Sequence, residues 1–195
     1  MMTGVRVYDG GMETAPTLIA VPWKPSRSTG VWMNVLSMLV AVVAGYLTFV
    51  IAFRGESGTI NFDVVGLGIT VGLIAVVLVV HEGIHGLAFL AYGGRPTFGA
   101  GIAGKALPYF YCTSVGQRFS VARYLVVALA PTIVVNGALV AALFSPAATW
   151  FVFPFAAHLA GCVGDWFLVF RALRAPRGSL VEDMKDGLII YKPAT

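Results

Sequence analysis

Four apolar segments, each long enough to cross a lipid bilayer, constrain this chain more than any other feature. They cover residues 31–53, 64–92, 124–144 and 149–170. A transmembrane helix needs roughly 20 consecutive apolar residues, and each segment supplies them. Only 11% of the residues are charged, whereas a soluble domain has about a quarter. We therefore predict an all-α membrane protein with about four transmembrane helices. The second segment is long and rich in glycine near its start, so we expect it to tilt or break.

The basic residues are distributed asymmetrically around these segments. Of the 13 Lys and Arg residues, Arg54 alone follows the first span, and all the others fall on the opposite side of a four-span topology. The positive-inside rule makes that side cytoplasmic, with both the N and C termini inside. The net charge of +4 is small and forms no basic stripe, so we expect no nucleic-acid partner. These features predict a multi-pass integral protein of the cell membrane, with the lipid bilayer as its surroundings.

The segments divide the chain into three predicted parts. Residues 1–30 form a cytoplasmic arm with a strand near 16–22, residues 31–170 form the four-span domain, and residues 171–195 form a cytoplasmic tail with a strand in "GLIIY". The glycine-rich inner loop 93–122 contains "PTFGAGI" and "LPYFYC", whose alternation is typical of short strands. This loop is either partly β and re-entrant, with protein covering its backbone, or an ordinary interfacial loop. Both interpretations stay open at this point.

Ionisable side chains are rare inside the four segments, and they form one suggestive set. Away from the span edges the set consists of His81, Glu82, His85, His158 and Asp165. The spans hold no Lys or Arg to pair with the two carboxylates. Each intramembrane charge costs about 2.5–3.5 kcal/mol on insertion scales. A bound cation that neutralises them is therefore the favoured interpretation.

The order His81-Glu82-x-x-His85 indicates which cation. Residues four apart lie on one face of a helix, so both imidazoles can bind the same ion, whereas Glu82 lies about 100° around the helix. This is the H-E-x-x-H pattern of zinc hydrolases. A catalytic zinc ion takes three protein ligands and keeps a position for water. We therefore predict one Zn²⁺ and a third protein ligand.

Asp165 is the candidate third ligand. At ~1.5 Å per residue, His81 and Asp165 lie roughly 15 and 9 Å from the cytoplasmic ends of their spans, so their depths agree. Asp165 has an alternative role, as a cap or hydrogen-bond partner for a neighbouring helix.

Three further polar side chains in the spans are open to more than one interpretation. His158 lies two turns before Asp165, where it is a donor to a metal ligand, a substrate contact or, as we favour, a helix-packing group. Asn136 is favoured as a polar group that packs and hydrogen-bonds between helices, and the alternative is an amide that holds substrate. Cys162 is favoured as a small packing residue over a soft metal ligand.

Three segments also carry a family resemblance, namely "HEGIHGLAFLAYGGRPTFG", "APTIVVNGALV" and "GCVGDWFLVFRAL". Over roughly residues 60–192 the chain resembles a zincin membrane peptidase family of unknown function. That family looks in turn like the site-2 proteases, which are intramembrane zinc metalloproteases. The resemblance implies that His81 and His85 are the zinc histidines, that Glu82 is the catalytic glutamate and that Asp165 is the third ligand.

The resemblance to site-2 proteases has departures. Those enzymes carry their aspartate in an Asn-x-x-Pro-x-x-Leu-Asp-Gly segment, whereas this chain has "AAHLAGCVGDWF". Pro131 and Asn136 lie one span earlier instead.

The leading functional hypothesis is an intramembrane zinc metallopeptidase. It would hydrolyse peptide bonds of a membrane-protein or peptide substrate near the cytoplasmic leaflet, with Glu82 as general base. The glycine-rich loop 93–118 is a candidate to present strand edges to an extended substrate. Alternatives are a metal transporter, which needs polar groups through both leaflets, and a non-catalytic metal-binding scaffold, which has no use for Glu82. Hydrolysis of a non-peptide bond also stays open.

Overall fold

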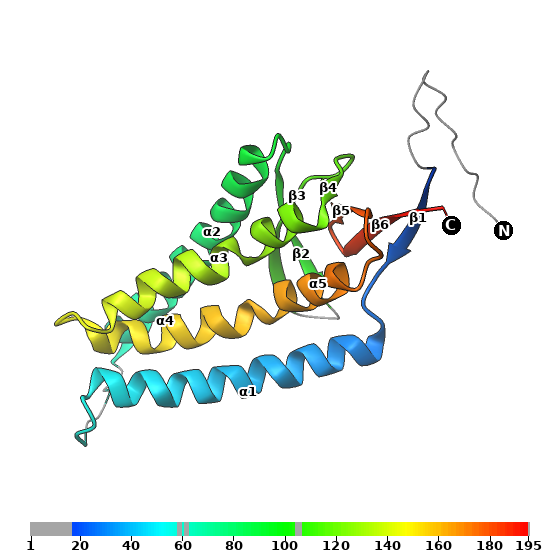
Figure 1. The fold of residues 1–195 in the computed structure, drawn as a ribbon. Coiled ribbons are helices and arrows are strands. Elements are labelled where there is room, and N and C mark those ends of the chain that lie inside the picture. Colours follow the sequence, from blue (N-terminus) through cyan, green and yellow to red (C-terminus); the bar gives the residue numbers. More distant parts are fainter. Residues whose placement is uncertain (1–16, 58–59, 61–62, 104–106, 195) are drawn as a thin grey trace.

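The computed structural model describes residues 17–57, 60, 63–103 and 107–194. Figure 1 shows long helices running side by side, with the strands gathered at one end of the molecule. The helices are α1 (Arg27–Ala52), α2 (Val64–Ala91), α3 (Val121–Ala142), α4 (Ala148–Gly161) and α5 (Val163–Leu173). The strands are β1 (Leu18–Trp23), β2 (Thr97–Ala103), β3 (Leu107–Thr113), β4 (Phe119–Ser120), β5 (Leu180–Met184) and β6 (Gly187–Pro193).

The helices make four segments that are long and apolar enough to cross a membrane. They are α1, α2, α3 and the α4–α5 pair, which together cover Ala148–Leu173. Most apolar side chains of α1 and α2 are exposed, so their faces are free to meet lipid rather than protein. The prediction of a multi-pass membrane protein is confirmed at this level. We expected the second segment to tilt or break; it does not break, because α2 is one helix of 28 residues, and the tilt stays a prediction.

Side chains at the helix starts explain where three of the helices begin. The Oγ of Ser26 accepts from the amide of Thr29 at 3.1 Å, and the Oδ1 of Asp63 accepts from the amide of Gly66 at 2.6 Å. Ser120 caps α3 in the same way. Each cap satisfies an amide that has no partner within its helix, which is needed where a helix enters an apolar environment.

The fourth span is interrupted at a single residue, Cys162. Its amide donates to the carbonyl of His158 at 3.0 Å, and its carbonyl accepts from the amide of Trp166 at 3.1 Å. The chain thus passes from α4 into α5 with a one-residue irregularity. As a consequence, Asp165 lies in the first turn of a new helix.

An antiparallel sheet of order β1-β6-β5-β4 lies at one end of the helices. Leu18 pairs with Pro193, so the two ends of the described chain lie side by side. The prediction of an all-α fold is therefore wrong in this part. The strands near 16–22 and in "GLIIY" are confirmed as β1 and β6, but the sheet depends on pairing between opposite ends of the chain, which short alternating segments do not reveal. Residues 1–16 of the predicted arm lie outside the described residues, and the three-part division stays a prediction.

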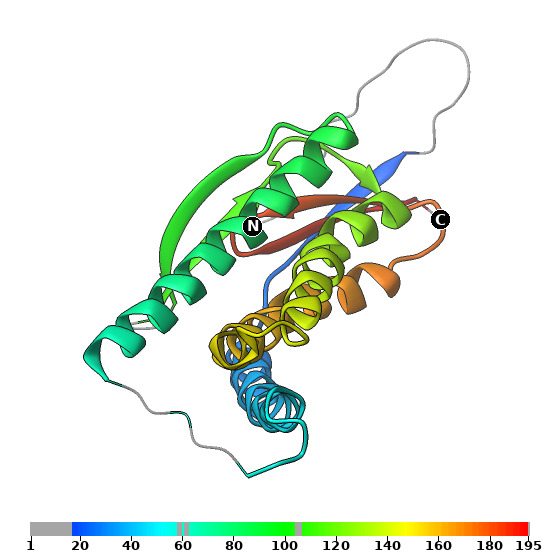
Figure 2. The same ribbon diagram turned by 90° about the vertical axis from the view of Figure 1, so that its left-hand side faces the viewer.

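The glycine-rich loop forms an antiparallel hairpin of β2 and β3, which runs alongside α2 (Figure 2). Gly99 and Gly101 pair with Tyr111 and Tyr109, and a Cβ at either glycine would meet the facing tyrosine ring. Gly86 of α2 likewise leaves room for the Phe98 ring. The expected strands in this loop are confirmed, and the glycines explain how their aromatic side chains pack.

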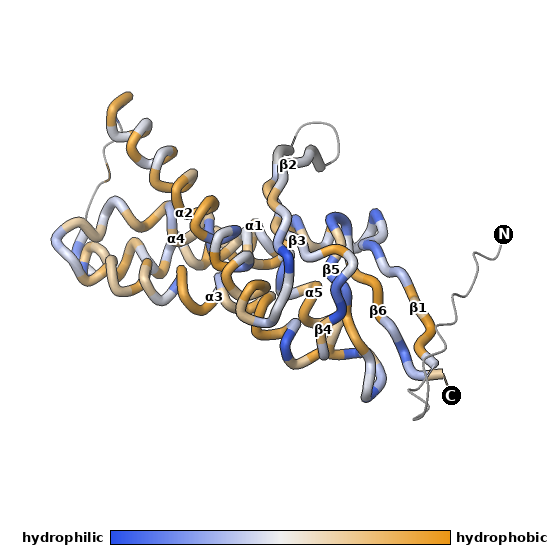
Figure 3. The backbone as a smooth tube through the Cα atoms, turned by 90° about the horizontal axis from the view of Figure 1, so that it is seen from above, coloured by the Kyte–Doolittle hydropathy of each residue, from blue (hydrophilic) through white to orange (hydrophobic). Residues whose placement is uncertain are grey.

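The sheet is attached to the helices by a buried apolar cluster. Its members come from α2, α3 and α5 on one side and from β3 to β6 on the other: Phe89, Cys112, Phe119, Tyr124, Val127, Ala128, Ala172, Val181, Leu188 and Ile190. Figure 3 shows the apolar character along the helices and the polar stretches concentrated around the sheet. Since the cluster packs the sheet against the helix ends, side chains on one face of β5 point toward the interior of the helical part.

Candidate metal centre

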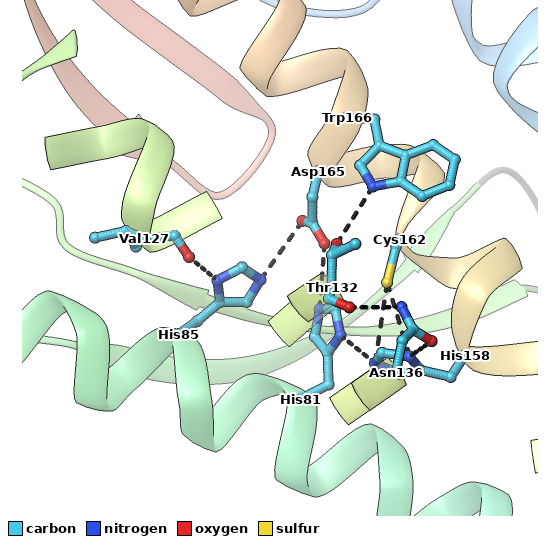
Figure 4. A network of polar contacts seen from close by, with 9 residues as sticks. All are labelled: His81, His85, Val127, Thr132, Asn136, His158, Cys162, Asp165 and Trp166. Carbon is cyan, nitrogen blue, oxygen red and sulfur yellow. Dashed lines mark hydrogen bonds and ion pairs between the residues drawn. The ribbon is translucent and has the colours of Figure 1, made fainter. Parts of the chain in front are cut away.

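The structure brings together three predicted residues from helices far apart in the sequence. His81 and His85 lie one turn apart on α2, and each is only 8% exposed. Asp165 reaches toward them from α5 (Figure 4). The Nε2 of His81 lies 3.4 Å from Oδ2 of Asp165, and the Nε2 of His85 lies 3.5 Å from Oδ1. Two imidazole nitrogens and a carboxylate, ligand types that zinc prefers, therefore lie within 4.8 Å of one another.

The spacing of these atoms fits a metal ion better than it fits hydrogen bonds. Two ligands bound to a tetrahedral zinc ion at about 2.0–2.1 Å lie about 3.4 Å apart, which follows from the tetrahedral angle. The Oδ2 of Asp165 is buried and accepts no hydrogen bond from the described residues. The donor set is thus suited to a zinc ion.

A backbone carbonyl orients His85. Its Nδ1 lies 3.0 Å from the carbonyl oxygen of Val127 on α3. Pro131, four residues later in the same helix, has no amide hydrogen to donate to that carbonyl. The proline therefore leaves the Val127 carbonyl free, and His85 donates to it. With Nδ1 protonated, the lone pair of Nε2 points toward Asp165.

A series of hydrogen-bonded side chains orients His81. Its Nδ1 lies 3.0 Å from Nε2 of His158, and the Nδ1 of His158 lies 2.9 Å from Oδ1 of Asn136. The amide nitrogen of Asn136 donates to the carbonyl of Thr132 at 2.8 Å. One arrangement of protons satisfies every bond, with His81 donating to His158 and His158 donating to Asn136. This arrangement also leaves the Nε2 lone pair of His81 directed toward Asp165.

A second set of metal-binding atoms shares His81 and includes His158 and Cys162. Both ring nitrogens of His158 already have partners at 2.9–3.0 Å, whereas the Cys162 sulfur lies 3.9 Å from each of them. A metal ion at this second position would break the chain to Asn136. The geometry therefore favours the set with Asp165.

Glu82 lies beside the three residues in a cavity of about 660 Å³. His85 and Asp165 line the same cavity, and the Glu82 carboxyl group faces the backbone of Cys112 on β3. The exposed residues Lys24 and Lys185 lie at its mouth, so the cavity opens at the end of the molecule that carries the sheet. Water can therefore reach the candidate site without crossing the apolar length of the helices.

Cys112 also lines this cavity, and its environment disfavours a thiolate. Burial raises the pKa of the Cys112 thiol to about 12, and the neighbouring Glu82 and Asp183 carboxylates add to the effect. At neutral pH and without a bound metal ion the thiol is therefore neutral, and a neutral thiol is a poor nucleophile.

Sequence reasoning missed two polar residues of this region, Asp183 and Tyr124. The Tyr124 hydroxyl donates to Oδ1 of Asp183 at 2.9 Å, and both residues line the cavity. Asp183 lies in "LVEDM", a segment whose composition is typical of a polar tail. The available signal was the two-residue period of a strand, which puts Asp183 on the same face as the fully buried Val181.

A helix carrying H-E-x-x-H opposite a carboxylate, set among membrane-length helices, defines a zincin-type membrane protein. Comparison with known families agrees: a family model described as "Putative zincin peptidase" matches residues 74–180 of the 195-residue chain. The chain belongs to this family, and the membership points to a metallopeptidase and to zinc in general. No curated protein and no solved structure matches the chain. The resemblance to site-2 proteases stays a prediction, as do the roles of the individual residues.

Proposed function

We propose that this protein is an intramembrane zinc metallopeptidase that hydrolyses peptide bonds of membrane-associated proteins or peptides near the cytoplasmic leaflet. His81, His85 and Asp165 would hold one zinc ion, and Glu82 would act as general base. The observation that carries the proposal is the spacing of 3.4 and 3.5 Å between the two Nε2 atoms and the Asp165 oxygens, beside a free glutamate in a water-accessible cavity.

Each residue has a definite part in this mechanism. A bound zinc ion supplies Lewis-acid polarisation of the scissile carbonyl and makes water a better nucleophile at neutral pH. Glu82 accepts a proton from water in the cavity and returns it to the leaving amine. Asp165, with its negative charge, offsets the positive charge of the site within the apolar surroundings. His158 and Asn136 hold the ring of His81, rather than contacting the substrate, because both are buried and neither lines the cavity.

The orientation in the membrane follows from the charges. Among the described Lys and Arg residues, only Arg54 lies at the end of the helices opposite the sheet. The positive-inside rule then makes the sheet, both termini and the mouth of the cavity cytoplasmic in the plasma membrane. Protease protection of tags at the two termini in sealed inverted and right-side-out vesicles tests this topology. Cleavage of both tags in right-side-out vesicles would contradict it.

The β2–β3 hairpin is our candidate for binding an extended substrate. These two strands pair only with each other among the described strands, so each keeps one free edge, and β3 lines the cavity. A free strand edge offers backbone hydrogen bonds to an unwound peptide. Deletion of the hairpin is expected to abolish cleavage with zinc still bound, and full cleavage by the deleted protein would disprove this part.

The principal experiment compares purified wild type with Glu82→Gln, His85→Ala and Asp165→Ala. We would measure zinc per chain and cleavage of a library of membrane peptides. Glu82→Gln is expected to keep zinc and lose turnover, since removal of a general base typically costs about 10²–10⁴-fold. His85→Ala and Asp165→Ala are expected to lose zinc. Glu56→Gln, in the exposed loop after α1, is the matched control for loss of a carboxylate.

The outcomes separate the peptidase from its rivals. Unchanged zinc in Asp165→Ala would remove this residue from the ligand set. Zinc uptake by proteoliposomes without peptide cleavage would favour a transporter, and tight zinc binding with neither activity would favour a scaffold. Full turnover in Glu82→Gln would contradict the proposed mechanism directly.

A further inference from the structure

The cavity beside the metal centre holds a buried carboxylate that the mechanism above does not use. Asp183 is 6% exposed and lines the same cavity as Glu82 and Asp165. Its one hydrogen bond from a described side chain comes from Tyr124, and no described lysine or arginine forms an ion pair with it. A carboxylate can accept about four hydrogen bonds. Asp183 therefore has acceptor capacity left and, when ionised, no counterion among the described lysines and arginines.

The electrostatic surroundings of Asp183 favour the arrival of a cation. Mainly because of burial, the pKa of the Asp183 carboxyl is raised to about 7; the hydrogen bond from Tyr124 and the nearby His85 act against this rise, and the Asp165 and Glu82 carboxylates add to it. Burial thus disfavours the charged form of Asp183 unless a cation lies beside it. A positive charge placed beside it would stabilise the carboxylate. A buried carboxylate that lines a cavity is a candidate for a functional site.

The lysines of the cavity do not supply that positive charge. Lys24 forms an exposed ion pair with Asp186 at 3.2 Å, and the Nζ of Lys185 lies 5.1 Å from the ring centroid of Tyr111. Both lysines are exposed, whereas Asp183 is buried. The cavity wall also includes Tyr109, Phe110 and Tyr111 of β3. An aromatic wall leading to a buried carboxylate suits a group with an apolar stem and a cationic head.

We propose that Asp183, oriented by Tyr124, is a binding subsite for a positively charged nitrogen group of the substrate, close to the scissile bond. The group is carried either by a lysine or arginine side chain or by a free N-terminal amine. This inference rests on the proposed function, because it positions the charge relative to a peptide bond at the metal centre. It adds a substrate class to that function: peptides with a cation beside the cleaved bond.

Binding to a protein that cannot turn over tests the subsite without relying on hydrolysis. The full-length Glu82→Gln protein, loaded with zinc in detergent, is titrated with matched peptides that differ only in lysine, acetyl-lysine or glutamate at one position. A second pair carries either a free or an acetylated N terminus. We expect the lysine peptide, the free-amine peptide or both to bind at least about tenfold more tightly than the neutral partner. Which pair shows the preference identifies the source of the cation.

Two variants in the Glu82→Gln background then locate the preference. Asp183→Asn should abolish it, and zinc content should stay unchanged. Glu182→Gln is the matched control, because Glu182 is also buried on β5 but bonds the amide of Gly116 and the Tyr191 hydroxyl instead of lining the cavity. This control should keep the preference. A preference that survives in Asp183→Asn would overturn the proposal.

Failure of the subsite and failure of the peptidase give different results. Equal binding of charged and neutral peptides would overturn the subsite in the Asp183-containing protein itself, whether or not Asp183→Asn folds. If wild type also cleaves both peptides equally, the peptidase stands without the subsite. Charge-selective binding that depends on Asp183, with no cleavage by wild type, would support the subsite and contradict the hydrolytic function.

Discussion

The two histidines of the candidate metal centre differ in what holds them. His85 donates to a backbone carbonyl, that of Val127, whereas His81 donates to a side chain, that of His158. Both bonds measure 3.0 Å, and both leave Nε2 directed toward Asp165. Two histidines one turn apart on α2 are therefore fixed in the same tautomer by different acceptors, one a side chain and the other a backbone carbonyl.

This difference indicates which side-chain substitutions should weaken zinc binding most. The Val127 carbonyl is fixed by the path of α3, and no side-chain substitution can remove it. His158 is itself held by Asn136, so the position of His81 depends on two further side chains in two other helices. Groups that hold metal-ligating histidines typically contribute 10–100-fold to metal affinity. We therefore expect substitutions on the His81 side to weaken zinc binding more than substitutions on the His85 side.

Among the groups that orient the two histidines, the largest effect on zinc affinity is expected for His158→Leu. It leaves Nδ1 of His81 without a partner and frees the ring to rotate or change tautomer, so zinc affinity should fall by about 10–100-fold. His158→Gln should restore most of the affinity, because its amide oxygen can accept from His81 while its amide nitrogen donates to Asn136. Competition with a fluorescent zinc chelator measures both. The absorption spectrum of the Co²⁺-substituted protein reports whether the ligand geometry has changed.

Cys162→Ala is the matched control for His158→Leu. It changes a buried side chain one turn away, whose sulfur lies 3.9 Å from His158. We expect near-normal zinc affinity. A loss of zinc as complete as in Asp165→Ala would instead favour the alternative ligand set of His81, His158 and Cys162. Unchanged affinity in His158→Leu would show that His81 needs no such partner.

A smaller effect is expected for Asn136→Leu, one step further from the metal centre. His158 loses the acceptor for its Nδ1 hydrogen but keeps its contact with His81, so zinc affinity should fall by roughly 3–10-fold. Because the two residues act through one chain, Asn136→Leu should cost little more when His158→Leu is already present. Fully additive losses in this double-mutant cycle would show that Asn136 acts independently of His158.

Much of this site could be predicted from the sequence, because the two histidines and the glutamate lie within one short segment. The H-E-x-x-H spacing fixes two imidazoles on one helical face, and the depth of Asp165 in its span made it the candidate third ligand. A contact between His158 and a metal ligand was one of the alternatives for His158, but the sequence could not select it or predict the link from His158 to Asn136. Both contacts depend on the rotation of α3 and α4 about their axes, which apolar segments in lipid leave open because every face is apolar. The packing role favoured for His158 and Asn136 did not anticipate the chain that joins them.

The fold, like the site, has parts that the sequence predicts and parts that it does not. Length and hydropathy predict the four spans, and alternation predicts the strands at the ends of the chain. The sheet itself was missed because β1 pairs with β6 across almost the whole sequence. Asp183 faces the cavity only as a result of that sheet. Its importance could therefore not be recognised from the segment that contains it.

The smallest effect is expected for Pro131→Ala, which is the test of the His85 side. The substitution returns an amide hydrogen that can bond the Val127 carbonyl within α3. A carbonyl oxygen has two lone pairs, so it can accept from this amide and from His85 together. Zinc affinity should therefore change by no more than about threefold, far less than in His158→Leu. A tenfold loss of zinc affinity in Pro131→Ala, with an altered Co²⁺ spectrum, would mean that the Val127 carbonyl is as easily disturbed as the His158 and Asn136 side chains. The contrast between the two histidines would then be wrong, and α3 would have to be regarded as a tuned part of the metal centre.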